Sequence, residues 1–224
     1  MDNAVALVQA YLRLNGFFTV TEFQVQQPAA GRPNVYETAT DLDILAIRLP
    51  WAAETVQGRQ PRPGATRAEV ILAEDPLLGL AAAGIDLVIG EVKEGVGELN
   101  RKLRTPEVLH AAVRRAGCCP EAHFETVVAQ LTSHGEAKSA SAEGIPCRLR
   151  LASFCGTVGS EAAEPILLTV TLGHIIAFVQ DRLRTYAPIL RSVAFRDPVL
   201  DLMKLMWKLG IELRIPQGQA GRGA

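Results

Sequence analysis

Two segments of the chain are apolar on both faces once their first residues are passed, residues 41–49 (DLDILAIRL) and residues 85–92 (IDLVIGEV). A half-exposed strand alternates apolar and polar residues, whereas a nearly continuous run of Val, Ile and Leu is typical of a strand covered on both sides. Pro50 ends the first segment, and Gly95 and Gly97 are expected to end the second. The chain is therefore expected to form an α/β fold with these two strands at the centre of a sheet.

Five other segments carry apolar residues at helical spacing and are expected to be helices. Capping residues or prolines near their first turns support these assignments. The expected helices are residues 3–15, 106–116, 120–133, 174–186 and 198–209. The further expected strands are residues 17–25, 147–154 and 166–172.

The remaining segments divide the chain into a core and an extension. Residues 50–68 hold three prolines and three arginines with no sustained period, which favours an exposed loop or an insertion. Residues 135–144 (GEAKSASAEG) are small and polar, as expected of a connector. We therefore expect an α/β core over residues 1–155, with an insertion near 50–80, and a mainly helical C-terminal extension over residues 156–224.

The composition limits the partners of the chain. Its 23 basic and 24 acidic residues leave a formal net charge of −1, so any site for a polyanion must be local. The longest apolar runs, residues 77–89 and 165–179, are shorter than the roughly 18 residues of a spanning helix, and no membrane partner is expected. The N-terminus has no basic region of the kind that begins a signal peptide, which favours a cytoplasmic protein. The four cysteines form no CxxC pair and are expected to be buried, reduced thiols.

Charged residues lie on the two central strands, where an unpaired carboxylate is disfavoured. Asp43 lies near the start of the first strand, and Glu91 and Lys93 lie near the end of the second. Because side chains alternate along a strand, Glu91 and Lys93 share a face while Val92 points away. Asp86 also begins a strand and is expected to be a solvated terminus. A carboxylate and an ammonium are thus predicted to share one small site.

This grouping suits metal-assisted hydrolysis of a phosphodiester. Asp43 and Glu91, with the backbone carbonyl of Val92, supply oxygen ligands of the kind that Mg²⁺ prefers, and Asp41 on the same face as Asp43 is a further candidate ligand. Mn²⁺ is expected to substitute for Mg²⁺. Lys93 is predicted to position the attacking water or to stabilise charge on the phosphorane. The alternative interpretation is a structural ion pair at the strand ends.

The order of helix, strand, DLDILA strand and GEVKEG strand resembles the core of the PD-(D/E)xK nuclease superfamily. The resemblance covers residues 3–116, with Asp43 at the first-motif aspartate and residues 91–93 at the ExK motif. It implies a restriction-endonuclease-like fold, in which a mixed central sheet is flanked by helices, together with Mg²⁺ as the cofactor and cleavage of DNA or, less often, RNA. The sequence departs from the family pattern in lacking a proline before the first aspartate, and its first helix offers Gln9 but no glutamate. Glu22 or Glu37 would supply a missing ligand if one is needed.

Three basic residues, Arg101, Lys102 and Arg104, follow the ExK strand. They either contact nucleic-acid phosphates or form a solvated helix face. Two other classes of function stay open: a nuclease-like binding or assembly module whose site has decayed, and a small-molecule metal hydrolase that uses the same carboxylates. DNA is the expected partner and RNA an alternative, and the oligomeric state is open, with a homodimer among the options.

Overall fold

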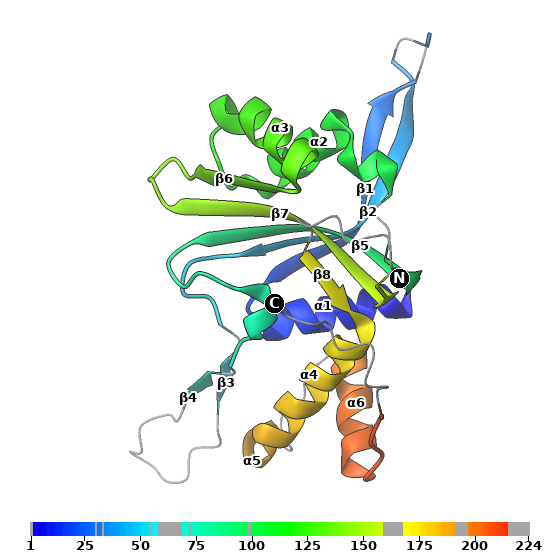
Figure 1. Ribbon diagram of the computed structural model, residues 1–224, viewed down its shortest axis with the longest axis vertical. Helices are drawn as coiled ribbons and strands as arrows, with labels where there is room; N and C mark the ends of the chain where they lie inside the picture. The colour runs from blue at the N-terminus through cyan, green and yellow to red at the C-terminus, as the bar shows by residue number, and fades with distance from the viewer. Residues whose placement is uncertain are drawn as a thin grey trace.

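The computed structural model describes residues 2–29, 31–32, 34–53, 55–57, 69–71, 73–97, 100–158, 168–190 and 197–214. A mixed, curled sheet lies at the centre with helices on both faces, so the expected α/β architecture is confirmed (Figure 1). Its strands follow the order β1-β2-β5-β7-β6, and β8 also pairs with β7. Their bounds are Phe18–Pro28 for β1, Tyr36–Arg48 for β2, Ile85–Val96 for β5, Glu136–Ala140 for β6, Pro146–Thr157 for β7 and Leu168–Thr171 for β8.

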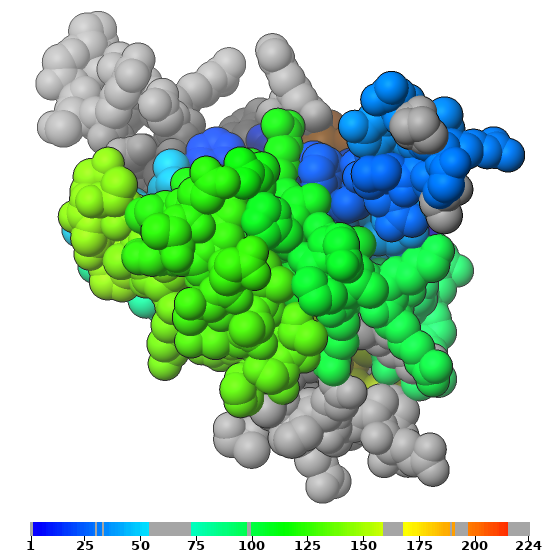
Figure 2. Space-filling model, turned by 90° about the horizontal axis from the view of Figure 1, so that it is seen from above, coloured from blue at the N-terminus to red at the C-terminus, as the bar shows by residue number. Residues whose placement is uncertain are grey.

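The direction of the strands follows from the lengths of the connections between them. β1, β2 and β5 pair antiparallel, whereas β5 and β7 run parallel. A parallel pair needs a long crossover, and here the crossover carries two helices, α2 (Pro106–Ala116) and α3 (Phe124–His134). Short 3-10 helices precede them, η2 (Arg101–Arg104) before α2 and η3 (Glu121–His123) before α3. α2 and α3 cover one face of the sheet, and the β1–β2 hairpin projects beside them (Figure 2).

The opposite face of the sheet is covered by helices from both ends of the chain. α1 (Asn3–Leu14), which begins where the Asp2 side chain accepts from the Ala4 N–H, packs there with α4 (Leu172–Thr185) and α6 (Pro198–Lys208). The short helix α5 (Ala187–Leu190) follows α4. Among the described residues after residue 156, β8 joins the central sheet, and α4, α5 and α6 follow it.

Neighbouring residues of β5 explain why its sequence shows no alternation. Leu87 is fully buried against α2 and α3, and Val88 is fully buried against α1 on the other face. Each face therefore needs its own row of apolar side chains, and the two rows together give a continuous apolar run. The interpretation of this segment as a strand covered on both sides is confirmed.

Three local expectations were wrong. The polar segment 135–144 contains β6, which forms an edge of the sheet, where polar side chains stay exposed. β5 continues to Val96 instead of ending before Gly95, because its bulged end still pairs with β7. Asp86 is buried rather than solvated, since two arginines of β7 bind it.

The region between β2 and β5 is only partly described. Two short strands, β3 (Thr55–Gln57) and β4 (Glu69–Ile71), pair antiparallel there, and a 3-10 helix, η1 (Pro76–Leu78), precedes β5. The rest of the expected loop over 50–68, residue 54 and residues 58–68, lies outside the described residues. None of the helices that the structure describes has the length and apolarity to cross a membrane. All four cysteines are buried free thiols, as expected.

Candidate functional site

Asp43 lies where β2 and β5 separate. The ladder between these strands runs from the pair Arg48–Asp86 to the pair Ile44–Gly90 and then ends. Asp43 comes next on β2, and its Oδ2 accepts a hydrogen bond of 2.8 Å from the backbone N–H of Val92. The carboxylate therefore binds a backbone group of β5 at the point where the regular pairing stops.

Glu91 and Lys93 form an ion pair on the adjacent strand. Lys93 Nζ lies 2.7 Å from Glu91 Oε1, and the side chain of Glu91 is only 5% exposed while that of Lys93 is 45% exposed. Burial raises the pKa of the Glu91 carboxyl, and the negative charge of Asp43 raises it further, against the lowering effect of Lys93. The hydrogen bond to Glu91 in turn raises the pKa of Lys93. We call Asp43, Glu91 and Lys93 the Asp43 cluster.

The backbone is irregular on the β1 side of this cluster. Glu22 falls between the pairs Thr21–Ile44 and Phe23–Leu42, directly opposite Asp43, and it has a φ of 53°. A non-glycine residue in the left-handed region is uncommon in a strand and costs conformational energy. The strain thus lies at the same level of the sheet as Asp43.

The end of β5 is also irregular, just after Lys93. The pairing with β7 shifts between Lys93 and Val96, and the backbone of Glu94 comes so close to Gly156 that a Cβ there would lie 1.9 Å from the Glu94 carbonyl oxygen. Gly97 similarly packs against Cys155 and leaves no room for a side chain. These glycines let the two strands approach closely beyond the Asp43 cluster.

The cluster offers hard oxygen ligands of the type that Mg²⁺ takes. The Val92 N–H binds Asp43 Oδ2 and the Lys93 ammonium binds Glu91 Oε1, so the second oxygen of each carboxylate is the candidate for a ligand. The N–H and C=O of a strand residue point to the same neighbouring strand, so the Val92 carbonyl lies on the side of Asp43. Two carboxylates and a backbone carbonyl are a suitable ligand set for Mg²⁺, which usually retains several of its bound water molecules. Within the described part of the chain, however, no three His, Cys, Asp or Glu side chains group closely enough to hold a metal ion.

The other acids considered from the sequence do not join the cluster as a third carboxylate. Asp41 is exposed and lies opposite Gln24 of β1. The Glu37 side chain accepts a hydrogen bond from Gln27 across the hairpin. Glu22 is the nearest in register, opposite Asp43, but it too forms no three-carboxylate group with Asp43 and Glu91.

The basic residues after β5 lie on the same face of the sheet as Glu91. Leu103 of η2 is buried in the core cluster that contains Leu87, and this anchors the short helix. Arg101 and Lys102 are exposed, and Lys102 Nζ donates to the carbonyl of Ala39 at 3.2 Å. Ala39 precedes Asp43 by four residues on β2, a distance along the strand of about 13 Å. Arg104 is only partly exposed.

Two buried ionic groups on the opposite face were not expected from the sequence. In the Asp86 cluster, Asp86 accepts hydrogen bonds from both Arg148 and Arg150. In the Asp75 cluster, Asp75 Oδ2 accepts from Tyr11 at 2.7 Å and lies 2.6 Å from His174 Nε2. Burial would raise the pKa of Asp75, but the hydrogen bonds from His174, the Leu77 N–H and Tyr11 outweigh it and lower that pKa.

No sequence spacing signals these two groups, because their members come from distant elements. Tyr11 lies on α1, Asp75 just before η1 and His174 on α4. Only the packing of α1 and α4 on one face of the sheet brings them together.

Comparison of the chain with family models, curated proteins and solved structures found no match. The geometry of the Asp43 cluster is therefore the basis for a functional assignment.

Proposed function

We propose that this protein is a metal-dependent phosphodiesterase that cleaves DNA, built on a restriction-endonuclease-like core. The observation that supports the proposal is the meeting of Asp43, Glu91 and Lys93 where β2 and β5 separate, with Asp43 bound to the Val92 N–H. These are the residues of the DLDILA and GEVKEG segments that resemble the PD-(D/E)xK motif. The order of α1, the antiparallel strands β1, β2 and β5, the helical crossover and the parallel strand β7 is compatible with such a core.

Each residue of the cluster has a distinct role in the proposed reaction. Asp43, Glu91 and the Val92 carbonyl would hold Mg²⁺ or Mn²⁺. When bound, the metal ion supplies a Lewis acid that polarises the phosphate and lowers the pKa of a bound water. The ammonium of Lys93 is half-exposed beside Glu91, where it can stabilise negative charge that develops on the phosphate.

The electrostatics of Glu91 favour the arrival of a cation. Its carboxylate is buried beside another carboxylate, and both effects disfavour its ionised form. A divalent cation between Asp43 and Glu91 would remove this penalty and release Lys93 from Glu91 toward the substrate. The exposed cations Arg101 and Lys102, on the same face of the sheet, would contact the nucleic-acid backbone.

One observation favours a second candidate, a nuclease-like module without activity that binds or assembles with a partner. The Lys93 Nζ, 2.7 Å from Glu91 Oε1, already compensates the charge of the Glu91 carboxylate, and no three-carboxylate group forms in the described part of the chain. An ion pair of this kind is also what a structural role would give. The two candidates differ in whether the cluster binds a metal ion and turns over DNA.

The test of the proposal is hydrolysis of linear, nicked and branched DNA in the presence of Mg²⁺ or Mn²⁺. Lys93→Ala should retain Mn²⁺ binding and lower the rate of cleavage by about two orders of magnitude, because one electrostatic contributor is typically worth that much. Asp43→Asn should abolish both Mn²⁺ binding and cleavage. Lys138→Ala, which removes an exposed lysine from β6, is the matched control and should cleave as the wild type does.

A different result would identify the second candidate. If the wild-type protein cleaves none of these substrates with either metal, and Lys93→Ala binds DNA or a protein partner as well as the wild type does, the nuclease proposal is wrong. Circular dichroism of each variant separates loss of function from loss of folding.

A further inference from the structure

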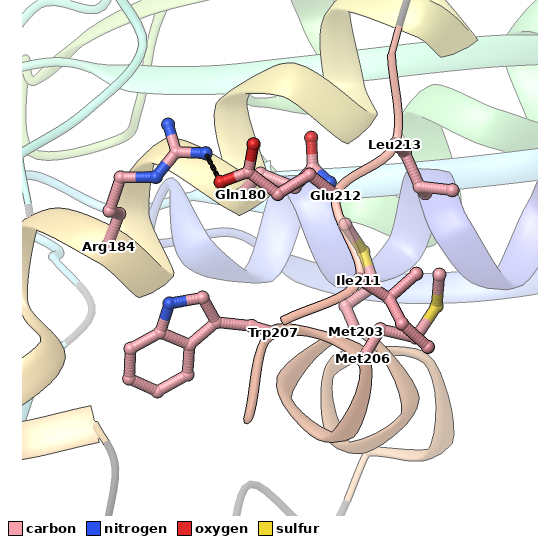
Figure 3. Close-up of a pocket in the computed structure, with 8 residues that line it drawn as sticks. All are labelled: Gln180, Arg184, Met203, Met206, Trp207, Ile211, Glu212 and Leu213. Atoms are coloured by element: carbon pink, nitrogen blue, oxygen red, sulfur yellow. Dashed lines mark hydrogen bonds and ion pairs between the residues drawn. The ribbon is translucent and has the colours of Figure 1, made fainter. Parts of the chain in front are cut away.

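The last described helix, α6, carries apolar side chains on two opposite faces. Its inner face packs on the body of the protein through Leu200 and Met203, which are buried in the same core cluster as α1 and α4. Met203 also lines a pocket with Trp207 and with residues of α4 and of the segment that follows α6 (Figure 3). The inner face of α6 is therefore already occupied.

The outer face of α6 carries a second apolar row. It consists of Leu202 and Leu205 of the helix and Leu209, which follows directly as its C-cap; they are 57%, 52% and 66% exposed. Their spacing of three and four residues is the a/d spacing by which two helices pack along a seam. The outer row, which we call the leucine stripe, therefore needs a covering partner.

The charges beside the leucine stripe indicate which partner fits. Asp201 and Lys208 are exposed and lie seven residues apart, so two helical turns place them on the same flank of the stripe. Neither forms an ion pair with any residue in the part of the chain that the structure describes. One flank thus has an acid near its N-terminal end and a base near its C-terminal end. An antiparallel copy of the same helix presents the opposite order.

We propose that α6 is a dimerisation helix, and that its leucine stripe packs antiparallel on the leucine stripe of a second copy of this chain. A two-fold axis close to Leu205 brings Asp201 of each copy opposite Lys208 of the other. The contact is then self-complementary, as the interface of a two-fold dimer must be. α6 lies at the periphery of the molecule beside α4, so a second copy can approach its outer face (Figure 1). This inference is independent of the proposed nuclease activity.

The size of the helix sets the strength of the expected dimer. A stable interface of standard size buries about 800 Å² on each partner. A single helix of 11 residues supplies only part of such an area. We therefore expect a dimer that forms at micromolar concentrations and dissociates on dilution.

The first experiment is sedimentation velocity of the full chain over a range of concentrations. The wild type should shift from monomer to dimer, and Leu205→Ser should raise the dissociation constant by about tenfold or more, because it removes the apolar side chain next to the axis from both copies. Leu49→Ser, which changes an exposed leucine outside α6, is the matched control and should dimerise as the wild type does.

The second experiment reverses the charges on the flank. Asp201→Lys and Lys208→Asp should each weaken the dimer, because each places like charges opposite one another at both ends of the contact. An equimolar mixture of the two variants should form a heterodimer, and the double variant Asp201→Lys/Lys208→Asp should regain the homodimer. This pattern depends on charge pairing between copies and would not arise from damage to the fold.

Three results would overturn the proposal. The first is a wild type that stays monomeric at every concentration. The second is a dimer that is unaffected by Leu205→Ser and by both charge reversals, since it would use another surface. The third is a monomer whose sedimentation with phosphatidylcholine–phosphatidylglycerol vesicles is lost in Leu205→Ser, since the stripe would then bind lipid instead of a second copy.

Discussion

Two charged clusters on the same strand, β5, each contain a buried carboxylate, but the two carboxylates are surrounded by different numbers of cations. Asp86 lies near the start of β5 and Glu91 five residues further along, so the two side chains point to opposite faces. Both are buried, and both have a basic partner. They differ in whether the surrounding groups compensate their charge.

The Asp86 cluster is fully compensated. Each oxygen of the Asp86 carboxylate accepts two hydrogen bonds from one guanidinium, Oδ2 from Arg148 and Oδ1 from Arg150. Arg150 also donates to the carbonyl of Leu78 in η1 at 2.9 Å, which ties the cluster to the segment before β5. Such a cluster holds elements together and leaves no carboxylate oxygen for a ligand.

The Asp43 cluster is not compensated in the same way. Lys93 pairs with Glu91, and burial together with the nearby charge of Asp43 still raises the pKa of Glu91. Groups that carry such a penalty are typical of functional sites, where a ligand relieves it. The contrast teaches that burial of a charge on β5 does not by itself indicate function. The number of cations around it is what separates the two clusters.

The largest effect that this comparison predicts is the loss of stability in Asp86→Asn. The neutral amide leaves the buried Arg150 and its neighbour Arg148 without a counter-charge, which we expect to lower the free energy of unfolding by about 3–5 kcal/mol. Urea denaturation at pH 7 measures it. Asp181→Asn is the control, because Asp181 is an exposed acid that also pairs with an arginine, and it should change the stability by less than about 1 kcal/mol. Equal losses in the two variants would contradict the structural role of the Asp86 cluster.

A smaller loss is expected in Asp75→Asn, and it should depend on pH. The lowered pKa of Asp75 means that its contribution to stability is fully present above the usual value of 3.8 and is lost as the pH falls through the lower folded-state pKa. At pH 7 the variant should be less stable by about 1–3 kcal/mol, because the charged acceptor of Tyr11 and His174 is removed. Unfolding curves at pH 7 and at pH 3 should show this difference shrinking in acid. A difference of the same size at both values would show that the charge of Asp75 is not what stabilises the fold.

The comparison also shows how far the sequence predicts this molecule. The two-sided strands, and with them the proximity of Glu91 to Lys93, follow from an apolar run interrupted by charges, because both burial and alternation are local properties. The role of Asp86 does not follow, since its partners lie on a strand that reaches it only through the crossover of α2 and α3. β6 was not predicted for a related reason. An edge strand buries few side chains, so its sequence resembles that of a loop.

The smallest predicted effect, and the one that most sharply separates the two clusters, is that of Glu91→Gln. In the wild type the raised pKa of Glu91 means that its stabilising contribution is present below the usual value of 4.5 and is lost as the pH rises through the folded-state pKa. Glutamine mimics the protonated form at every pH. In acid, the metal-free variant should therefore have the same free energy of unfolding as the wild type. At pH 7 its free energy of unfolding should be higher by less than about 1 kcal/mol, because the ion pair that it loses, to the exposed Lys93, is weak and offsets little of the gain.

The opposite sign of this effect relative to Asp86→Asn is the decisive measurement. In thermal unfolding at pH 7 without metal, Glu91→Gln should melt at or slightly above the temperature of the wild type. Mn²⁺ should raise the melting temperature of the wild type but not that of Glu91→Gln. Glu94→Gln, which removes an exposed acid from the same strand, should leave the Mn²⁺ effect unchanged. If Glu91→Gln instead lowers the melting temperature by as much as Asp86→Asn does, Glu91 is a structural partner of Lys93, and both charged clusters of β5 serve the stability of the fold.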